Sequence, residues 1–152
     1  MSRFANALLM GNLQEMNLEM AQIVLTSVSS FDSGIKPAGG SIQPENYFHG
    51  LTTGLLICLM DSYHLTSNRE SGLGRYDLCL EPVNRQKSRS AYILEFKVFD
   101  PAKGDENTKD TARRARNQID EQKYDLGLLQ KGYPSIRKYG AGFRGKDVWI
   151  TD

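Results

Sequence analysis

The stretch 74-GRYDLCLEPVNRQKSRSAYILEFKV-98 contains the features that decide the fold. Its two ends are rich in apolar and aromatic residues and residues 83–90 are polar, which predicts two strands joined by a basic loop. The first strand carries Asp77, and the second carries Glu95 and Lys97. Side chains alternate between the faces of a strand, so Glu95 and Lys97 point to the same face. If the strands pair as a hairpin, Asp77 reaches that face too.

Two carboxylates and a lysine on one face have two interpretations. Acids and lysines on an exposed strand form ordinary cross-strand pairs, which is the simpler interpretation for Glu95 and Lys97 alone. Carboxylates also suit Mg²⁺, which binds through one or two protein acids and keeps several waters. Without a cation, Asp77 and Glu95 would repel each other. The cluster therefore predicts a divalent cation, with Lys97 placed to orient or deprotonate a water.

The composition is that of one soluble domain. The chain has 152 residues, of which 39% are apolar and 24% charged, and this suits a hydrophobic core and excludes a disordered chain. The longest apolar run, residues 55–60, is far shorter than the about 20 residues that span a membrane. The N-terminus has no signal-peptide pattern. Cys58 and Cys79 lack CxxC spacing, so we expect buried free thiols and a reducing cytoplasm.

The net charge of +1 conceals an asymmetry. Residues 1–80 carry 4 Lys/Arg against 7 Asp/Glu, a net of −3, and residues 81–152 carry 15 against 11, a net of +4. The basic side chains form three clusters along the chain: Arg85, Lys87 and Arg89, then Arg113, Arg114 and Arg116, then Arg137, Lys138, Arg144 and Lys146. Such clusters suit phosphate groups, although a solvated surface explains each one equally well.

Apolar residues at helical spacing predict helices over residues 13–28, 44–60 and 108–130. Pro44 suits the first turn of the second helix. The Ser- and Gly-rich residues 29–43 predict a linker. We therefore expect residues 1–43 to form an N-terminal helical extension and linker, and residues 44–152 to form the main domain.

The second helix carries two further candidates. Glu45 and His49 are four residues apart and share a face. Glu45 is either a first-turn acid favoured by the helix dipole or a third carboxylate of the site. His49 has two interpretations. The simpler one is a histidine that forms a hydrogen bond from the helix, and the other is a metal ligand.

The remaining pattern completes an α/β layout. Residues 62–68 predict a first strand, residues 70–74 a turn, and residues 91–98 the central strand. Residues 136–143 and 148–150 predict two more strands joined by a tight turn. The order of one helix, three strands, one helix and two strands predicts a mixed central sheet flanked by helices.

This order, with Asp77 and Glu95-Phe96-Lys97, resembles the PD-(D/E)XK nuclease superfamily. The blocks that carry the resemblance are ENYFHGLTTGLL (45–56), SNRESGLGRYD (67–77), YILEFKV (92–98), NQIDEQKY (117–124) and YGAGFRGKDV (139–148). E-x-K alone is a weak signal, but five blocks in order are specific. The chain is most similar to the branch often found C-terminal to an AAA-ATPase-like domain in bacterial proteins.

The resemblance implies a restriction-endonuclease-like αβββαβ fold and a nuclease that depends on Mg²⁺ or Mn²⁺ and hydrolyses phosphodiester bonds of DNA rather than RNA. Asp77 and Glu95 would be metal ligands and Lys97 the catalytic lysine. Glu45 would be a third acidic ligand, and Gln118 would support the site from the following helix.

The sequence departs from the family patterns at two places. Tyr76 stands where the name-giving proline would be, which leaves the role of Asp77 intact. The helicase-nuclease pattern QxxxY is not met, because Tyr124 follows Gln118 by six residues, roughly 240° of rotation on a helix. We therefore expect Tyr124 to be structural. Arg75, within a matching block, is expected to contact phosphate.

The resemblance leaves a second function open. No GxxxxGK[ST] motif occurs, so ATP hydrolysis by this chain is not expected, and an AAA-ATPase-like domain would be a partner. The alternative to an enzyme is a nuclease-like fold with weak or absent catalysis that binds nucleic acid or a partner protein. The complete set of Asp77, Glu95 and Lys97 favours the enzyme. The oligomeric state, with a homodimer as one choice, stays open.

Overall fold

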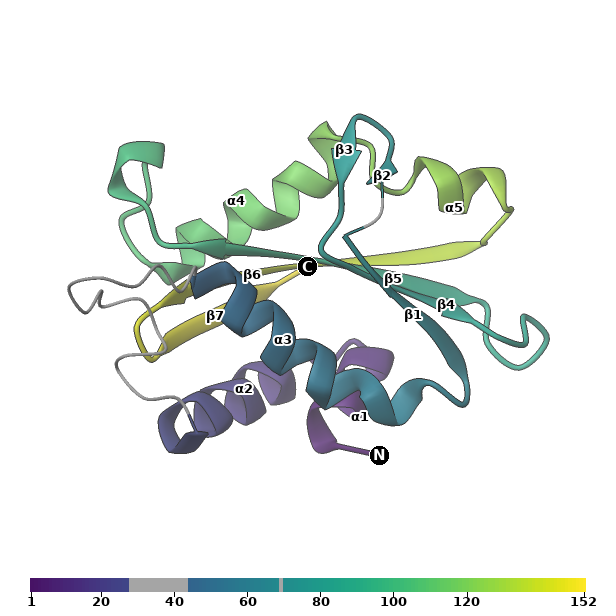
Figure 1. Ribbon diagram of the computed structural model, residues 1–152, viewed down its shortest axis with the longest axis horizontal. Coiled ribbons are helices and arrows are strands. Elements are labelled where there is room, and N and C mark those ends of the chain that lie inside the picture. Colours follow the sequence, from purple (N-terminus) through teal and green to yellow (C-terminus); the bar gives the residue numbers. More distant parts are fainter. Residues whose placement is uncertain (28–43, 69) are drawn as a thin grey trace.

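The structure, a computed structural model, describes residues 1–27, 44–68 and 70–152, and its centre is a five-stranded sheet in the order β1-β4-β5-β6-β7 (Figure 1). The strands are β1 (Tyr63–Ser67), β4 (Leu78–Pro82), β5 (Ser90–Val98), β6 (Ser135–Arg144) and β7 (Asp147–Thr151). Strands β5 and β6 are parallel, and the other neighbours are antiparallel. The predicted mixed α/β sheet is therefore confirmed, consistent with a restriction-endonuclease-like arrangement.

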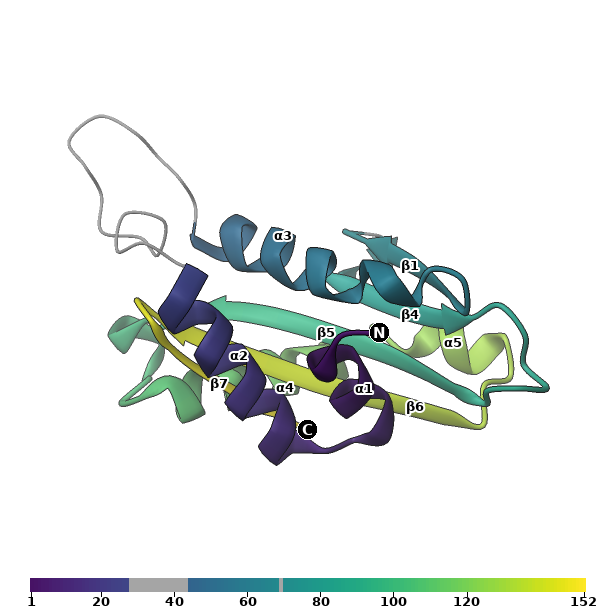
Figure 2. The ribbon, with the colours of Figure 1, turned by 90° about the horizontal axis from the view of Figure 1, so that it is seen from below.

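Helices cover both faces of the sheet (Figure 2). One face carries α1 (Arg3–Met10), α2 (Leu13–Ser27) and α3 (Pro44–Leu56), and the other carries α4 (Thr108–Glu121) and α5 (Leu126–Gln130). Two short 3-10 turns, η1 (Ile57–Leu59) and η2 (Pro101–Lys103), follow α3 and β5. The linker predicted at residues 29–43 lies outside the described residues.

The alternation of β5 divides the core in two. Tyr92, Leu94 and Phe96 enter a larger core with α1, α2 and α3. Ala91 and Ile93 point the other way, into a smaller core with α4 and α5. Because side chains alternate along a strand, the next residue on the α4 side is Glu95, which places a carboxylate where the pattern would otherwise continue with an apolar residue.

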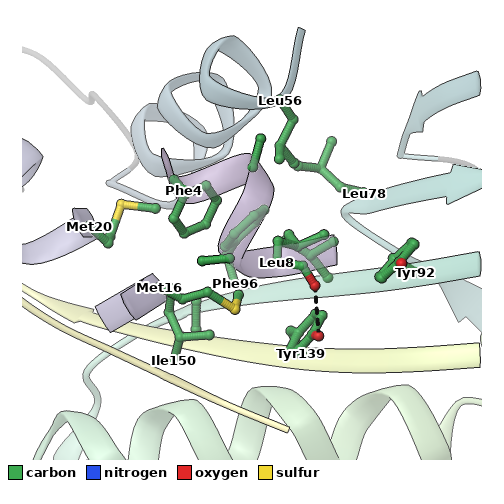
Figure 3. Close-up of a cluster of buried hydrophobic side chains, with 14 of the residues drawn as sticks. Phe4, Leu8, Met16, Met20, Leu56, Leu78, Tyr92, Phe96, Tyr139 and Ile150 are labelled. Carbon is green, nitrogen blue, oxygen red and sulfur yellow. Dashed lines mark hydrogen bonds between the residues drawn. The ribbon is translucent and has the colours of Figure 1, made fainter. Parts of the chain in front are cut away.

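The N-terminal helices belong to the larger core (Figure 3). Phe4 and Leu8 of α1 and Met16 and Met20 of α2 are all at most 1% exposed. The Tyr139 hydroxyl donates to the carbonyl of Leu8 at 3.0 Å, which ties α1 to β6. The sequence pattern had predicted α2 but not α1.

Two glycines of β6 allow α4 to lie directly on the sheet. A Cβ atom at Gly140 would overlap the backbone of Ala112 and Arg116, and one at Gly142 would overlap the backbone of Thr108 and Ala112. A backbone approach this close requires glycine. It sets the height of α4 above β5, and with it the height of Gln118 above Glu95.

Two local predictions were wrong, and a third, the turn at residues 70–74, was right about the turn but missed the strands that flank it. The helix predicted over residues 108–130 breaks after Glu121, because Lys123 adopts a left-handed φ of 53° before α5 begins. The turn predicted at residues 70–74 is a small hairpin of β2 (Glu70–Ser71) and β3 (Gly74–Arg75). Asp77 precedes β4 instead of lying within a strand.

The two cysteines form no disulfide. Cys79 is buried as expected, whereas Cys58, in the 3-10 turn η1, is exposed, so the expectation of two buried thiols was wrong for Cys58. Among the described residues, no helix combines the length and apolar character needed to cross a membrane.

Candidate active site

The sheet opens where β4 separates from β5. These strands pair only from Leu78 opposite Leu94 to Leu80 opposite Tyr92. Next to the Leu78–Leu94 pair, the Asp77 side chain takes the place of a backbone acceptor, since its Oδ2 accepts the N–H of Phe96 at 2.7 Å. The N–H of Asp77 in turn donates to Glu95 Oε2 at 3.3 Å. The opening therefore places the two carboxylates side by side.

Lys97 and Gln118 complete the cluster. Lys97 Nζ lies 3.3 Å from Glu95 Oε1, and the lysine side chain is 20% exposed while that of Glu95 is 2% exposed. Gln118 reaches down from α4, and its Nε2 donates to the same Oε1 at 2.6 Å. The structure thus brings together Asp77, Glu95, Lys97 and Gln118 on the α4 side of the sheet.

Burial makes the charged form of both carboxylates less favourable. Burial, followed by repulsion from Asp77, raises the pKa of Glu95 to about 8. Burial also raises the pKa of Asp77, against the opposing effects of the Phe96 N–H and the Lys97 charge. A carboxylate whose pKa is raised in this way is stabilised by any cation that binds beside it.

This chemistry fits a divalent cation. Asp77 and Glu95 offer two adjacent carboxylates, which suits Mg²⁺ or Mn²⁺ because such ions bind through one or two acids and retain waters. Within residues 1–27, 44–68 and 70–152, no group of three or more His, Cys, Asp or Glu side chains gathers around one point. The described donors are therefore a pair.

The expected direct participation of Glu45 is not seen in this arrangement. Glu45 is exposed in the first turn of α3, and within the described residues it does not form a group of three metal-ligating side chains with Asp77 and Glu95. It lines the same groove as Lys97, and its charge contributes to raising the pKa of Asp77. Glu45 is therefore close enough to act on the site electrostatically.

His49 supports Asp77 from the opposite face of the sheet. Its Nε2 lies 3.2 Å from the Asp77 carbonyl oxygen, which only accepts, so Nε2 carries a proton. The imidazole also contacts the Phe96 ring edge-on, at 6.1 Å between centroids. The simpler interpretation, a hydrogen-bonded helix histidine, describes this geometry.

Tyr124 is a site contact that sequence reasoning missed. Gln118 Nε2 lies 3.0 Å from the Tyr124 hydroxyl, so the structure corrects the expectation that these residues cannot meet. That expectation assumed that the helix continues past Glu121. Instead, the chain turns after Glu121 and brings the Tyr124 side chain next to Gln118. The left-handed turn was not readable from the sequence, because Lys123 is not a typical left-handed residue.

If the site has the phosphodiesterase activity that the resemblance implies, we expect Tyr124→Phe to lower its rate by roughly tenfold, because Gln118 would lose one of the two partners that fix its amide against Glu95. The change removes only a hydroxyl, so the midpoint of thermal unfolding should move little. Steady-state kinetics should show the loss in kcat with KM nearly unchanged. An equal loss from Tyr133→Phe, whose hydroxyl contacts Glu81 instead, would contradict a specific role.

With this geometry established, comparison with known proteins identifies the family. A profile described as PD-(D/E)XK nuclease superfamily matches residues 43–152. The chain belongs to the PD-(D/E)XK nuclease superfamily. The match begins just before α3 and includes every residue of the cluster, and it supports a nuclease-like function. Searches of curated proteins and of solved structures found no match.

The site of this PD-(D/E)XK domain opens into a groove of about 900 Å³. Its lining comes from three places: Glu45 at the start of α3, the end of β5 with the η2 loop (residues 97–105), and the face of α4 from residue 110 to residue 121. Lys97 and Gln118 belong both to the cluster and to this lining. The groove is therefore the route by which a substrate would reach the carboxylates.

The predicted basic residues of the domain lie in different places. Arg113 and Arg114 line the groove. Arg85, Lys87 and Arg89 lie in the loop before β5, at the opposite end of that strand from Glu95, about 17 Å away along the strand (Figure 1). Arg75 is exposed at the end of β3, two residues before Asp77.

Arg114 is held by a buried ion pair. Its Nε and Nη2 donate to Asp105 at 3.1 and 2.7 Å, and Nη2 also donates to the Val98 carbonyl at 3.1 Å. Asp105 accepts further from Thr111 and from the Asp100 N–H. These bonds fasten the η2 loop to α4, so Arg114 shapes the wall of the groove.

The ion pair between Asp105 and Arg114 predicts that the protein loses stability in acid. The Arg114 guanidinium is the main reason that the pKa of Asp105 falls from 3.8 to about 2. A pKa lowered by folding stabilises the protein above the unfolded value, and that stabilisation, about 2 kcal/mol, is lost as the pH falls from about 5 to 2. Denaturant unfolding over this range should show a steeper loss for the native protein than for Asp105→Asn. If the unfolding free energy of the native protein and of Asp105→Asn depended on pH in the same way, the stabilising role of the Asp105–Arg114 ion pair would be contradicted.

Proposed function

We propose that this chain is a nuclease that uses Mg²⁺ or Mn²⁺ to hydrolyse phosphodiester bonds of DNA. The observation that supports it is the adjacent pair of the half-buried Asp77 and the buried Glu95, with Lys97 Nζ 3.3 Å from Glu95 and facing a groove open to solvent. A structural salt bridge would not require a second carboxylate beside the first, with a pKa that burial raises.

Each residue of the cluster has a distinct part in this proposal. Asp77 and Glu95 would hold the cation, with Glu45 as a further acid in the same groove. A bound cation of this kind lowers the pKa of a coordinated water and neutralises charge on the phosphate. Lys97 orients the attacking water and stabilises the negative charge that develops during attack. Gln118 fixes the direction of the Glu95 carboxylate.

The setting of the activity is part of the same proposal. The resemblance to one branch of the superfamily supports a bacterial cytoplasmic protein that acts with an AAA-ATPase-like partner domain. The start of the family match at residue 43 supports a further part of the proposal, the division into an extension of residues 1–43 and a main domain of residues 44–152. Size-exclusion chromatography with and without DNA would distinguish a monomer from a homodimer.

The testing experiment combines cleavage with metal binding. Linear DNA, circular DNA and RNA are incubated with the native protein and with Asp77→Asn, in Mg²⁺, Mn²⁺ or EDTA. We expect the native protein alone to cleave DNA, and only with metal. Either ion should also raise its midpoint of thermal unfolding, since a ligand that binds only the folded state stabilises it.

The other outcomes are equally informative. Cleavage by Asp77→Asn at the native rate would contradict the assigned site. No cleavage and no metal-dependent rise in the unfolding midpoint, with DNA binding retained, would identify the alternative: a nuclease-like module that binds nucleic acid or a partner without catalysis.

A further inference from the structure

We propose that the groove along α4 binds single-stranded nucleic acid, with Lys103 and Arg113 contacting its phosphates and Phe99 contacting a base. This inference rests on the proposed nuclease function and specifies the substrate. It also assigns a role to Lys103 and Phe99, which the sequence pattern did not single out.

The lining of the groove contains both cations and apolar side chains. Val98 and Phe99, which follow Lys97 at the end of β5, are its apolar members. Phe99 is half-buried, with the Arg144 guanidinium 4.2 Å from its ring centroid. Sites that bind single strands combine cations with aromatic side chains, on which the unpaired bases stack, and this groove places Lys103 and Arg113 in the same lining as the Phe99 ring.

Ion pairing separates the available cations from the committed ones. Arg114 is bound to the buried Asp105, so its charge is already neutralised. Arg113 is 66% exposed, and its partner Asp110 is a neighbour on the same helix. Such an exposed pair contributes little and can exchange for a phosphate. Lys103 is exposed and has no ion pair within the described part of the chain.

The acids of the groove favour one strand over two. Glu45, Asp100, Asp110 and Glu121 line it together with the cations. A duplex carries one negative charge per about 1.7 Å of its axis, against about 3.4 Å for one strand, so it meets more repulsion from these acids. The basic cluster at Arg85, Lys87 and Arg89 lies at the far end of β5 and cannot offset that repulsion within the groove.

The test measures binding without cleavage. Asp77→Asn, in Mg²⁺, is titrated into a fluorescent single-stranded DNA and into a blunt duplex of equal length, at several salt concentrations. We expect the single strand to bind at least tenfold more tightly. Lys103→Gln with Arg113→Gln should reduce the slope of log affinity against log salt by about 1.4, since each phosphate contact on a single strand contributes about 0.7.

A matched double variant in the other basic cluster is the control. Lys87→Gln with Arg89→Gln removes the same number of exposed cations at the other end of β5. We expect it to keep the parental slope. Phe99→Leu keeps this part of the lining apolar but removes the ring, and should weaken single-strand binding roughly five- to tenfold. Thermal unfolding of each variant checks that the fold is intact.

Defined outcomes overturn the inference. Tighter binding of the duplex, or a change of slope in the Lys87/Arg89 pair instead of the Lys103/Arg113 pair, would move the nucleic acid out of this groove while leaving the nuclease proposal standing. Native affinity in Phe99→Leu would remove the stacking contact. Failure of the native protein to bind or cleave any nucleic acid would instead reject the nuclease function itself.

Discussion

Replacing Lys97 with alanine is expected to lower the rate of DNA cleavage by about 10²–10⁴-fold, the range that one positioned proton-transfer group contributes. Lys97 Nζ is the cation nearest to the buried carboxylates, 3.3 Å from Glu95 Oε1, and its side chain still lines the groove. The Asp77 and Glu95 carboxylates remain in the variant. Metal should therefore still raise its midpoint of thermal unfolding.

Single-turnover cleavage at saturating metal measures this effect apart from substrate binding. Lys146→Ala is the control, because Lys146 is an exposed lysine in the turn between β6 and β7. Its rate should match that of the native protein. If Lys97→Ala cleaves at the native rate, the role assigned to Lys97 is wrong, whatever the control shows.

Gly140→Ala is expected to lower the free energy of unfolding by about 3 kcal/mol, near the upper end for overpacking a well-packed interior. The new Cβ would overlap the backbone of Ala112 and Arg116, which cannot move aside as a flexible side chain could. The helix α4 must then rise from β6. Because Gln118 lies on α4, its 2.6 Å bond to Glu95 lengthens, and the rate of cleavage should also fall.

Denaturant unfolding gives the free energy, and Gly54→Ala provides the matched control. Gly54 lies in α3, where a Cβ meets no described atom within 4 Å. Alanine is the better helix former, so this change should stabilise the protein by up to about 1 kcal/mol. Equal unfolding free energies for Gly140→Ala and Gly54→Ala would show that α4 is not held down by the glycine contact.

The sequence by itself determined the order of the main elements, the mixed sheet and the three residues at the core of the candidate site. The alternation along residues 91–98 sends Glu95 and Lys97 to the face opposite Phe96, and the pairing of β4 with β5 then places Asp77 beside them. These consequences are local, because they depend only on the two-residue period of a strand and on one hairpin.

Tertiary structure alone decided which distant residues join the site. Tyr124 reaches Gln118 because α4 ends early. That end is fixed by Lys138, which pairs with Asp120 and Asp125 on either side of the turn, and by the Leu73 N–H, which donates to the Gln122 carbonyl at 2.8 Å. Each partner is distant in sequence, so no local period contains it.

The same distinction applies to the basic residues. Two clusters of similar composition looked equivalent in the sequence, but β5 separates them by its own length, and one of the two arginines in the groove is bound to a buried acid. Charge can be counted along a chain, whereas its availability to a phosphate depends on what the fold has already paired with it. For Asp77, Glu95 and Lys97 the strand period was sufficient, and for their supporting residues the packing of α4 was required.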